Sequence, residues 1–147
     1  MKLYIINGPN LNMLGIREPS VYGKADYATL LDLCKKRANE LGIDVVFYQS
    51  NHEGDLVDKI QEAYYEDAFG IVINPGAYTH TSIALLDAVK ATALPTVEVH
   101  ISKLDERESF RQISFIGLAA YKTIKGHGIF GYTEAIDMLY SLYLEGK

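Results

Sequence analysis

The sequence lacks a second cysteine, a long apolar run and an excess of positive charge. Cys34 is the single cysteine among 147 residues, so no intrachain disulfide can form and a reducing compartment fits. No apolar run approaches the roughly 20 residues that cross a bilayer, so we expect no membrane span. The first residues also lack the pattern of a secretory signal peptide. These absences together predict a cytoplasmic protein.

The charge balance and the composition narrow the class of protein further. Acidic residues outnumber basic ones by 19 to 14, for a net charge of -5, and no basic stripe is visible. Nucleic acids bind through such basic surfaces, so we expect no nucleic-acid partner. The composition, 48% hydrophobic and 22% charged, is ordinary for a globular protein. A chain of this length suggests one domain, residues 1–147, that buries roughly 70% of its unfolded surface.

Apolar runs that suit strands alternate along the chain with amphipathic stretches that suit helices. Asp26 and Gly42 suit the two ends of the first of these helices. The alternation predicts an α/β fold, a flavodoxin-like doubly wound five-stranded parallel sheet with helices on both faces. The expected strands are residues 3–6, 43–48, 69–73, 96–99 and 119–124. The expected helices are residues 27–41, 55–65, 81–92 and 133–144, with a short one at 106–112.

Polar residues gather where the predicted strands end. They occupy residues 7–12, 49–53, 74–81 and 98–102. In open parallel sheets, ligands bind beyond the carboxyl ends of the strands, where the strand order reverses. The sequence therefore predicts a ligand site at this edge of the sheet.

The connection after the first strand, residues 8–23, is the most informative segment. It is more than twice as long as the about 2–6 residues that usually join a strand to a helix. It carries Asn12, Arg17 and Tyr22 among glycines and prolines, and its apolar residues argue against disorder. We interpret it as a functional loop. A free tyrosine titrates near pH ~10, and neighbouring guanidinium groups would stabilise its ionised form.

A second polar segment follows the third predicted strand. Asn74 and His80 precede a predicted helix, whose free backbone N–H groups would suit an anionic or polyhydroxylated ligand. A simple helix cap by Thr79 or Thr81 explains the same segment without any function.

A carboxylate and an imidazole follow one another in the fourth predicted strand. Glu98 and His100 are two residues apart and so lie on one face of the strand. The carboxylate can hold the imidazole in one tautomer and favour its charged form, which makes His100 a candidate general acid. The alternative is a hydrogen-bonded histidine at the end of the sheet without a chemical role.

Three familiar signals are set aside. The glycine run at residues 126–131 matches a dinucleotide-binding fingerprint, but only 16 residues follow it, too few for the βαβ unit. We expect these glycines to allow close packing of a helix on the sheet. The four histidines do not cluster at metal-ligand spacing, so no metal site is predicted. Cys34 lies within a helical pattern, which indicates a core residue and not a nucleophile.

Several motifs follow one another in order along the chain. They are residues 7–12 (NGPNLN), 17–19 (REP), 22–23 (YG), 49–51 (QSN) with 53–54 (EG), 74–84 (NPGAYTHTSIA), 98–102 (EVHIS), 107–108 (RE) with 110–111 (FR), and 131–132 (GY). With this spacing the chain resembles the type II 3-dehydroquinate dehydratases, or type II 3-dehydroquinases, over nearly its whole length. The resemblance implies a cofactor-free anti elimination of water from 3-dehydroquinate, which gives 3-dehydroshikimate in the shikimate pathway.

The resemblance also implies a basic half of the site. Tyr22 would remove a proton from C2 of the substrate, and Arg17 would lower the pKa of that tyrosine. Arg107 would add a second positive charge near the loop, and Asn12 would position a water that stabilises the enolate. Fixed donors of this kind are what a developing enolate requires.

The acidic half and the binding groups are implied in the same way. His100, oriented by Glu98, would protonate the departing C1 hydroxyl. Asp87 would reach the site of a neighbouring subunit, because members of the family form trimers packed into dodecamers. The residues implied to bind the substrate are Asn74, His80, Asp87, Ile101, Ser102, Arg107 and Arg111.

One position departs from the family's pattern, and one function from another class stays open. Lys103 stands where the family usually has Asn, and we expect its side chain to point off the site. The alternative function is a non-catalytic flavodoxin-like module that binds flavin or another small molecule. Such a module would need a hydroxyl-rich phosphate loop after the first strand, where this chain has Asn, Pro, Arg and Tyr.

Overall fold

The computed structural model describes residues 1–16 and 25–146. Within these ranges, five parallel strands form one sheet in the order β2-β1-β3-β4-β5. This is the flavodoxin-like strand order, with its reversal between β1 and β3, and it confirms the predicted fold. The strands are β1 (Lys2–Asn7), β2 (Asp44–Gln49), β3 (Gly70–Asn74), β4 (Thr96–His100) and β5 (Lys122–Lys125).

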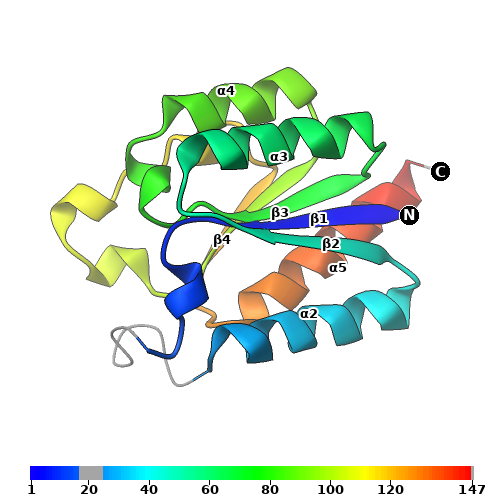
Figure 1. Cartoon of the computed structure of the whole chain (residues 1–147), viewed down its shortest axis with the longest axis horizontal. Coiled ribbons are helices and arrows are strands. Elements are labelled where there is room, and N and C mark those ends of the chain that lie inside the picture. Colours follow the sequence, from blue (N-terminus) through cyan, green and yellow to red (C-terminus); the bar gives the residue numbers. More distant parts are fainter. Residues whose placement is uncertain (17–24, 147) are drawn as a thin grey trace.

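The helices cover both faces of the sheet, as the alternation of strands and helices predicts. Figure 1 shows α3 and α4 over one face, and α2 and α5 over the other. They are α2 (Tyr27–Leu41), α3 (Glu53–Tyr65), α4 (Ile83–Thr92) and α5 (Phe130–Glu145). The expected ends of α2 are confirmed, since the Asp26 side chain accepts a hydrogen bond from the Thr29 N–H and Gly42 ends the helix at φ 71°.

Two of the sequence-based expectations are wrong. Residues 106–112 do not form one helix, because two short 3₁₀ turns, Leu104–Glu106 and Ser109–Arg111, occupy that region. The segment has no apolar stripe to bury, and its one large apolar residue, Phe110, is 66% exposed, so a helix this short has nothing to stabilise it. The last strand begins at Lys122 instead of residue 119, because a third 3₁₀ turn, Ile116–Leu118, intervenes.

Each face of the sheet has its own apolar core, because successive side chains of a strand point to opposite faces. Leu3, Ile5, Val97 and Val99 pack toward α2 and α5. Tyr4, Ile6, Ile71 and Ile73 pack with residues of α3 and α4. Cys34 of α2 is fully buried in the first core, which confirms it as a core residue. In the parts of the chain that the structure describes, no helix is both long and apolar enough to cross a membrane.

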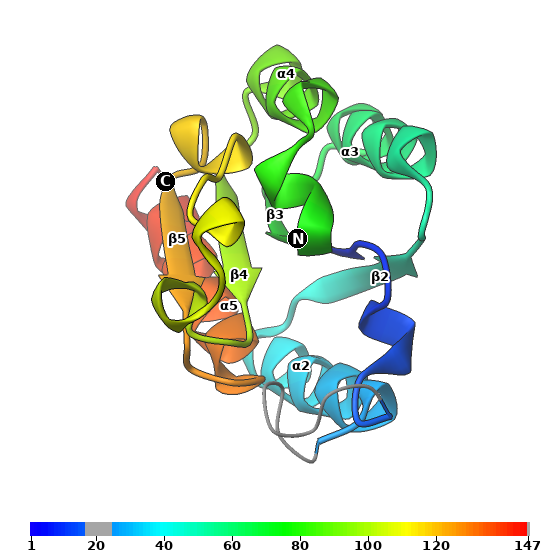
Figure 2. The ribbon, with the colours of Figure 1, turned by 90° about the vertical axis from the view of Figure 1, so that its left-hand side faces the viewer.

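The carboxyl ends of the strands meet at one edge of the molecule, which faces the viewer in Figure 2. The chain leaves β1 and β3 at adjacent points there, and their backbones nearly touch. The Gly8 N–H donates to the Asn74 carbonyl at 2.7 Å. A Cβ atom at Gly8 would lie 2.6 Å from the carbonyl carbon of Pro75, so only glycine fits this approach.

We therefore expect Gly8→Ala to destabilise the fold, because the side chain would meet backbone that cannot swing away. The free energy of unfolding in urea should fall by about 2 kcal/mol or more. Gly54→Ala is the matched control, since a Cβ at Gly54 would meet nothing within 4 Å. That variant should be as stable as the parent or slightly more stable, because alanine favours the helix. Equal stability of the two variants would contradict the argument.

Candidate active site

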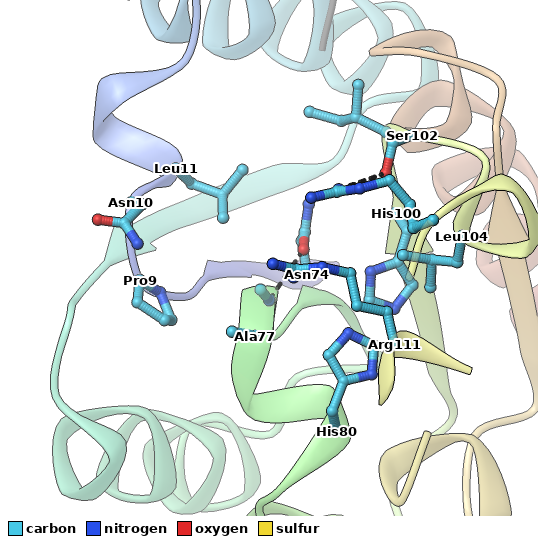
Figure 3. A pocket seen from close by; sticks show the side chains of 13 residues that line it. Pro9, Asn10, Leu11, Asn74, Ala77, His80, His100, Ser102, Leu104 and Arg111 are labelled. Carbon is cyan, nitrogen blue, oxygen red and sulfur yellow. Dashed lines mark hydrogen bonds between the residues drawn. The ribbon is translucent and has the colours of Figure 1, made fainter. Parts of the chain in front are cut away.

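A pocket lies at the carboxyl edge of the sheet, where the sequence predicts the ligand site. It brings together seven of the predicted site residues, contributed by β3, β4 and the segments that follow these two strands. Figure 3 shows His80, His100 and Arg111 around one side of this space, with Pro9, Asn10 and Leu11 across from them. The lining residues are Pro9, Asn10, Leu11, Asn74, Gly76, Ala77, His80, His100, Ile101, Ser102, Leu104, Arg107 and Arg111.

Behind the pocket, Glu98 is fully buried and is surrounded by donors. One carboxylate oxygen accepts from the His100 Nε2–H and from the Thr79 hydroxyl. The Ser114 hydroxyl lies 2.9 Å from both oxygens, and the Thr123 hydroxyl donates to the other oxygen at 3.0 Å. Thr123 stands directly opposite Glu98 in the register of β4 and β5. The predicted pairing of Glu98 with His100 is therefore present, and three hydroxyls complete it.

These partners keep the Glu98 carboxyl group ionised in spite of its burial. Desolvation raises its pKa, but the hydrogen bond and charge of His100, together with the Thr79 and Ser114 hydroxyls, outweigh it and lower the pKa to about 2. An anionic acceptor holds the His100 proton on Nε2 and fixes the plane of the ring. The pair can thus act as an oriented acid at the wall of the pocket.

The simpler interpretation of this segment, in which Thr79 caps the following helix, is wrong. The cap of α4 is Ser82, whose hydroxyl accepts from the Leu85 N–H at 3.0 Å. Thr81 makes no cap either, and α4 begins only at Ile83. The segment between β3 and α4 is a 3₁₀ turn, Gly76–His80, which places the Thr79 hydroxyl on Glu98.

His80 lies beside His100 in the pocket wall and is held by a different partner. Its Nδ1 is 2.7 Å from the Ile113 carbonyl oxygen, so Nδ1 carries the proton and donates. Partial burial lowers the pKa of His80, which favours the neutral ring. The Nε2 atom of a neutral His80 is then left to accept a hydrogen bond. His80 is therefore suited to bind a hydroxyl group.

Two guanidinium groups approach the same space from the segment after β4. Arg111 Nε lies 2.6 Å from a Glu108 carboxylate oxygen, and Arg107 Nε lies 3.8 Å from the same oxygen. Arg107 also donates to the Ser102 hydroxyl at 3.4 Å. These two guanidinium groups form the positive wall of the pocket, and such groups suit an anionic ligand.

The opposite wall is braced by the polar segment after β2. Asn10 has a left-handed backbone at φ 69°, and its N–H donates to the Asn51 side chain at 3.0 Å. The Gln49 amide donates to the Gly8 carbonyl at 3.1 Å, and the Tyr78 hydroxyl donates to the Asn51 carbonyl at 2.9 Å. The motif at residues 49–51 therefore supports the loop after β1 and does not itself line the pocket.

Among the predicted site residues that the structure describes, Asn12, Glu98 and Asp87 do not line this pocket, and Glu98 lies behind it. Asn12 is exposed in the 3₁₀ turn Leu11–Met13, and Asp87 is exposed on α4. Arg17 and Tyr22 lie outside the described residues.

The sequence analysis did not predict two of the hydrogen-bond partners of Glu98, Thr123 and Ser114. Thr123 could have been found from strand register, whereas Ser114 lies in an irregular segment that carries no periodic signal.

Gly131 and Lys103 behave as expected, whereas a Cβ at Gly128 would meet nothing within 4 Å and one at Gly126 would meet only Lys103. A Cβ at Gly131 would lie 3.2 Å from Val99 and 3.3 Å from Ile124, so this glycine brings the start of α5 close to the sheet. Lys103 lies against Gly126 and does not line the pocket. Within residues 1–16 and 25–146, no three His, Cys, Asp or Glu side chains are arranged to hold a metal ion.

The fold and the site together define an α/β protein of the open-sheet type, whose pocket at the carboxyl edge combines a carboxylate–imidazole pair with two arginines. The family described as class II dehydroquinase matches residues 1–140, and the chain belongs to that family. The family assignment decides between the two functions left open by the sequence. The protein is an enzyme, a hydro-lyase, and not a non-catalytic flavin-binding module.

Individual relatives agree with this assignment. A 3-dehydroquinate dehydratase of Rhodopseudomonas palustris is 56% identical over 137 residues, which cover 93% of this chain and 91% of that protein. One of Caldicellulosiruptor saccharolyticus is 52% identical over 138 residues, or 94% and 95% of the two chains. The crystal structure of a type II dehydroquinase from Butyrivibrio crossotus has a TM-score of 0.93 at 51% identity, covering 95% of this chain and 97% of that one.

The low pKa of Glu98 predicts a specific loss of stability in acid. Its folded pKa of about 2 lies below the ordinary value of 4.5, so its stabilisation is complete above pH 4.5 and is lost as the pH falls toward 2. The Glu98→Gln variant has no carboxyl group to protonate at this position, so its stability does not include this pH-dependent contribution. The difference in unfolding free energy between parent and Glu98→Gln should therefore shrink by roughly 3 kcal/mol between neutral pH and about pH 2.

Urea unfolding at a series of pH values measures this difference. Glu145→Gln, at the exposed end of α5, is the control, and its difference from the parent should stay nearly constant. A constant difference for Glu98→Gln as well would show that the carboxyl group is not held ionised by its neighbours.

Proposed function

We propose that this chain removes water from 3-dehydroquinate by anti elimination through an enolate, without a cofactor, to give 3-dehydroshikimate in the shikimate pathway. The observation that carries the proposal is the buried Glu98–His100 pair, which shares a pocket with Arg107 and Arg111. The match to the class II dehydroquinase family indicates 3-dehydroquinate as the substrate, and the pocket contains groups whose chemistry suits this substrate.

His100 is the general acid of the proposed reaction. Loss of the C1 hydroxyl as hydroxide is unfavourable, so a proton must reach that oxygen as the C1–O bond breaks. The ring of His100 lies in the pocket wall, and its hydrogen bond to Glu98 fixes its orientation. Assistance of this kind is worth about 10²–10⁴-fold in rate.

Tyr22 is the proposed base, on the opposite face of the substrate. Its phenolate takes a proton from C2, and the electrons of the C–H bond form the enolate with the C3 carbonyl. The enolate then collapses, the C1–C2 double bond forms, and water leaves with the proton of His100. Arg17 lowers the pKa of Tyr22, Arg107 adds positive charge, and Asn12 positions a water that stabilises the enolate oxygen.

The binding groups follow the chemistry of the pocket. Asn74, His80 and Arg111 bind hydroxyl groups of the substrate, and the backbone N–H groups of Ile101 and Ser102 bind its carboxylate. All five residues line the pocket. The positive wall formed by Arg107 and Arg111 supports an anionic substrate, because it favours a carboxylate over a neutral ligand.

The assembly and location are part of the same proposal. Asp87 is exposed on α4, away from the pocket of its own chain, where it is free to reach the site of a neighbouring subunit. We take the functional form to be a homododecamer, a tetramer of trimers, in the cytoplasm. The unpaired thiol of Cys34, fully buried in the core, suits a reducing compartment.

Ultraviolet absorbance tests the reaction and the base together, because the product is a conjugated enone and the substrate is not. The parent should give a rising signal with 3-dehydroquinate, and Tyr22→Phe should give at least 10²-fold less while still binding substrate. Tyr65→Phe, which removes an exposed hydroxyl on α3, is the control and should keep full activity. A silent parent would refute the proposed function.

Borohydride treatment tests the enolate mechanism separately from the base. Borohydride added with substrate should leave the parent active, since no lysine Schiff base forms. Inactivation by borohydride would refute the enolate route, and normal turnover by Tyr22→Phe would refute Tyr22 as the base.

His100→Ala should lose rate and also some affinity, because the imidazole both donates the proton and touches the substrate. We expect kcat to fall by about 10²–10⁴-fold, with a smaller rise in KM. His127→Ala is matched to it, because His127 is exposed and pairs with Glu134 away from the pocket. Steady-state kinetics separates the two variants, and an unchanged kcat in His100→Ala would remove His100 as the acid.

A further inference from the structure

Ser114 contacts the buried Glu98 carboxylate but does not line the pocket. It lies in the irregular segment between the turns Ser109–Arg111 and Ile116–Leu118. Its hydroxyl is 2.9 Å from both carboxylate oxygens of Glu98, and the oxygen of that hydroxyl accepts from the Gly117 N–H at 2.9 Å. A serine that only capped the second turn would need the Gly117 contact alone. The contact with Glu98 therefore requires another explanation.

The direction of these hydrogen bonds follows from the groups that make them. The Gly117 N–H can only donate, so it occupies a lone pair of the Ser114 oxygen. The ionised Glu98 carboxylate can only accept, so the Ser114 proton points to it. The Thr79 oxygen lies 3.1 Å from the Ser114 oxygen, but a neutral hydroxyl is a weaker acceptor than a carboxylate. Ser114 is therefore a donor to Glu98.

Backbone contacts hold Ser114 in place beside the carboxylate. The Phe115 N–H donates to the Thr79 carbonyl at 2.9 Å, which ties this segment to the turn after β3. A Cβ atom at Gly117 would lie 3.0 Å from the Ser114 oxygen and 3.2 Å from Glu98 Oε1, so a residue without a side chain permits this close approach. The position of Ser114 is therefore set by the backbone that follows it.

The Glu98 carboxylate needs partners on both oxygens to keep one orientation, because the last side-chain torsion of a glutamate has no sharp minimum. One oxygen accepts from His100 and Thr79, and the other accepts from Thr123. Ser114 contacts both oxygens, so it restrains the plane of the group directly. If the carboxylate turned out of this plane, the His100 ring would lose the acceptor that orients it.

We propose that Ser114 is a positioning residue for the proton donor, which fixes the plane of the Glu98 carboxylate and through it the orientation of the His100 ring. The inference rests on the proposed function, in which His100 protonates the departing hydroxyl group. Ser114 acts through the carboxylate and does not touch the substrate, since it does not line the pocket. Its effect therefore falls on the chemical step and not on substrate binding.

Ser114→Ala tests the proposal because it removes the hydroxyl and leaves the carboxylate in place. We expect kcat to fall about tenfold, the effect of one lost hydrogen bond to a charged group, with KM within about twofold of the parent. Thr96→Val is the matched control, since it removes a buried hydroxyl from β4 that donates to the Leu94 carbonyl at 2.9 Å. That variant should lose stability without a change in kcat. Assays run well below the melting temperature of every variant keep the folded fraction constant.

A double-mutant cycle with Glu98→Gln separates positioning from a merely structural role. If Ser114 acts through the carboxylate, adding Ser114→Ala to Glu98→Gln should change kcat by less than about twofold. An equal fall in kcat in both backgrounds, or a lower melting temperature with kcat unchanged, would overturn the proposal. If Ser114→Ala does not fold, Ser114→Cys tests the same link in the same cycle, because a thiol fills the place of the hydroxyl but is a weak donor.

The outcome also separates this inference from the proposed function. Loss of the proposed function shows as a parent that does not convert 3-dehydroquinate. In that case, the same cycle measured by urea unfolding still tests the link between Ser114 and Glu98, since residues in contact have non-additive effects on stability. Additive effects on stability would overturn the inference in that case. An active parent with additive effects on kcat would leave the function standing and remove the role of Ser114.

Discussion

The site depends on an ionised carboxylate kept in the interior of the protein. Glu98 interrupts the apolar sequence of a central strand, and burying a charge without partners costs several kcal/mol or more. The chain meets this cost with donors from four separate places: the 3₁₀ turn after β3, β4 itself, the irregular segment before β5, and β5. The charge therefore has hydrogen-bond partners in all four places, and its bond to His100 orients that ring.

The sheet divides the site into two layers with different partners. Side chains of Glu98 and His100 point to the face of α3 and α4, as Ile73 does, and they form one half of the site. Asn7 and Asn74 point to the face of α2 and α5, where the Tyr132 hydroxyl donates to Asn7. Both layers open at the same edge, because parallel strands end together there. A ligand at this edge can thus contact groups that are fixed independently of one another.

The sequence predicts the features that follow from the side-chain alternation of a strand and from the order of strands and helices along the chain. Alternation places Glu98 beside His100, and strands that end together place Asn74, His80 and His100 around one pocket. Ser114 could not be predicted, because it reaches Glu98 from a segment without regular structure. The helix expected at residues 106–112 does not form, because turns and ion pairs hold those residues in place and no apolar face is available to stabilise a helix.

The two halves of the pocket differ in how firmly their groups are held. His100 and Asn74 stand on central strands, and the partners of each fix its side chain in one orientation. Arg107 and Arg111 come from short turns and share the exposed carboxylate of Glu108, an arrangement that solvent weakens. Rigid strands give the more exact placement, and the proton transfer that we propose for His100 would require it. Charge acts over a longer range and tolerates looser placement, so the arginines can lie on the turns while His100 lies on the strand.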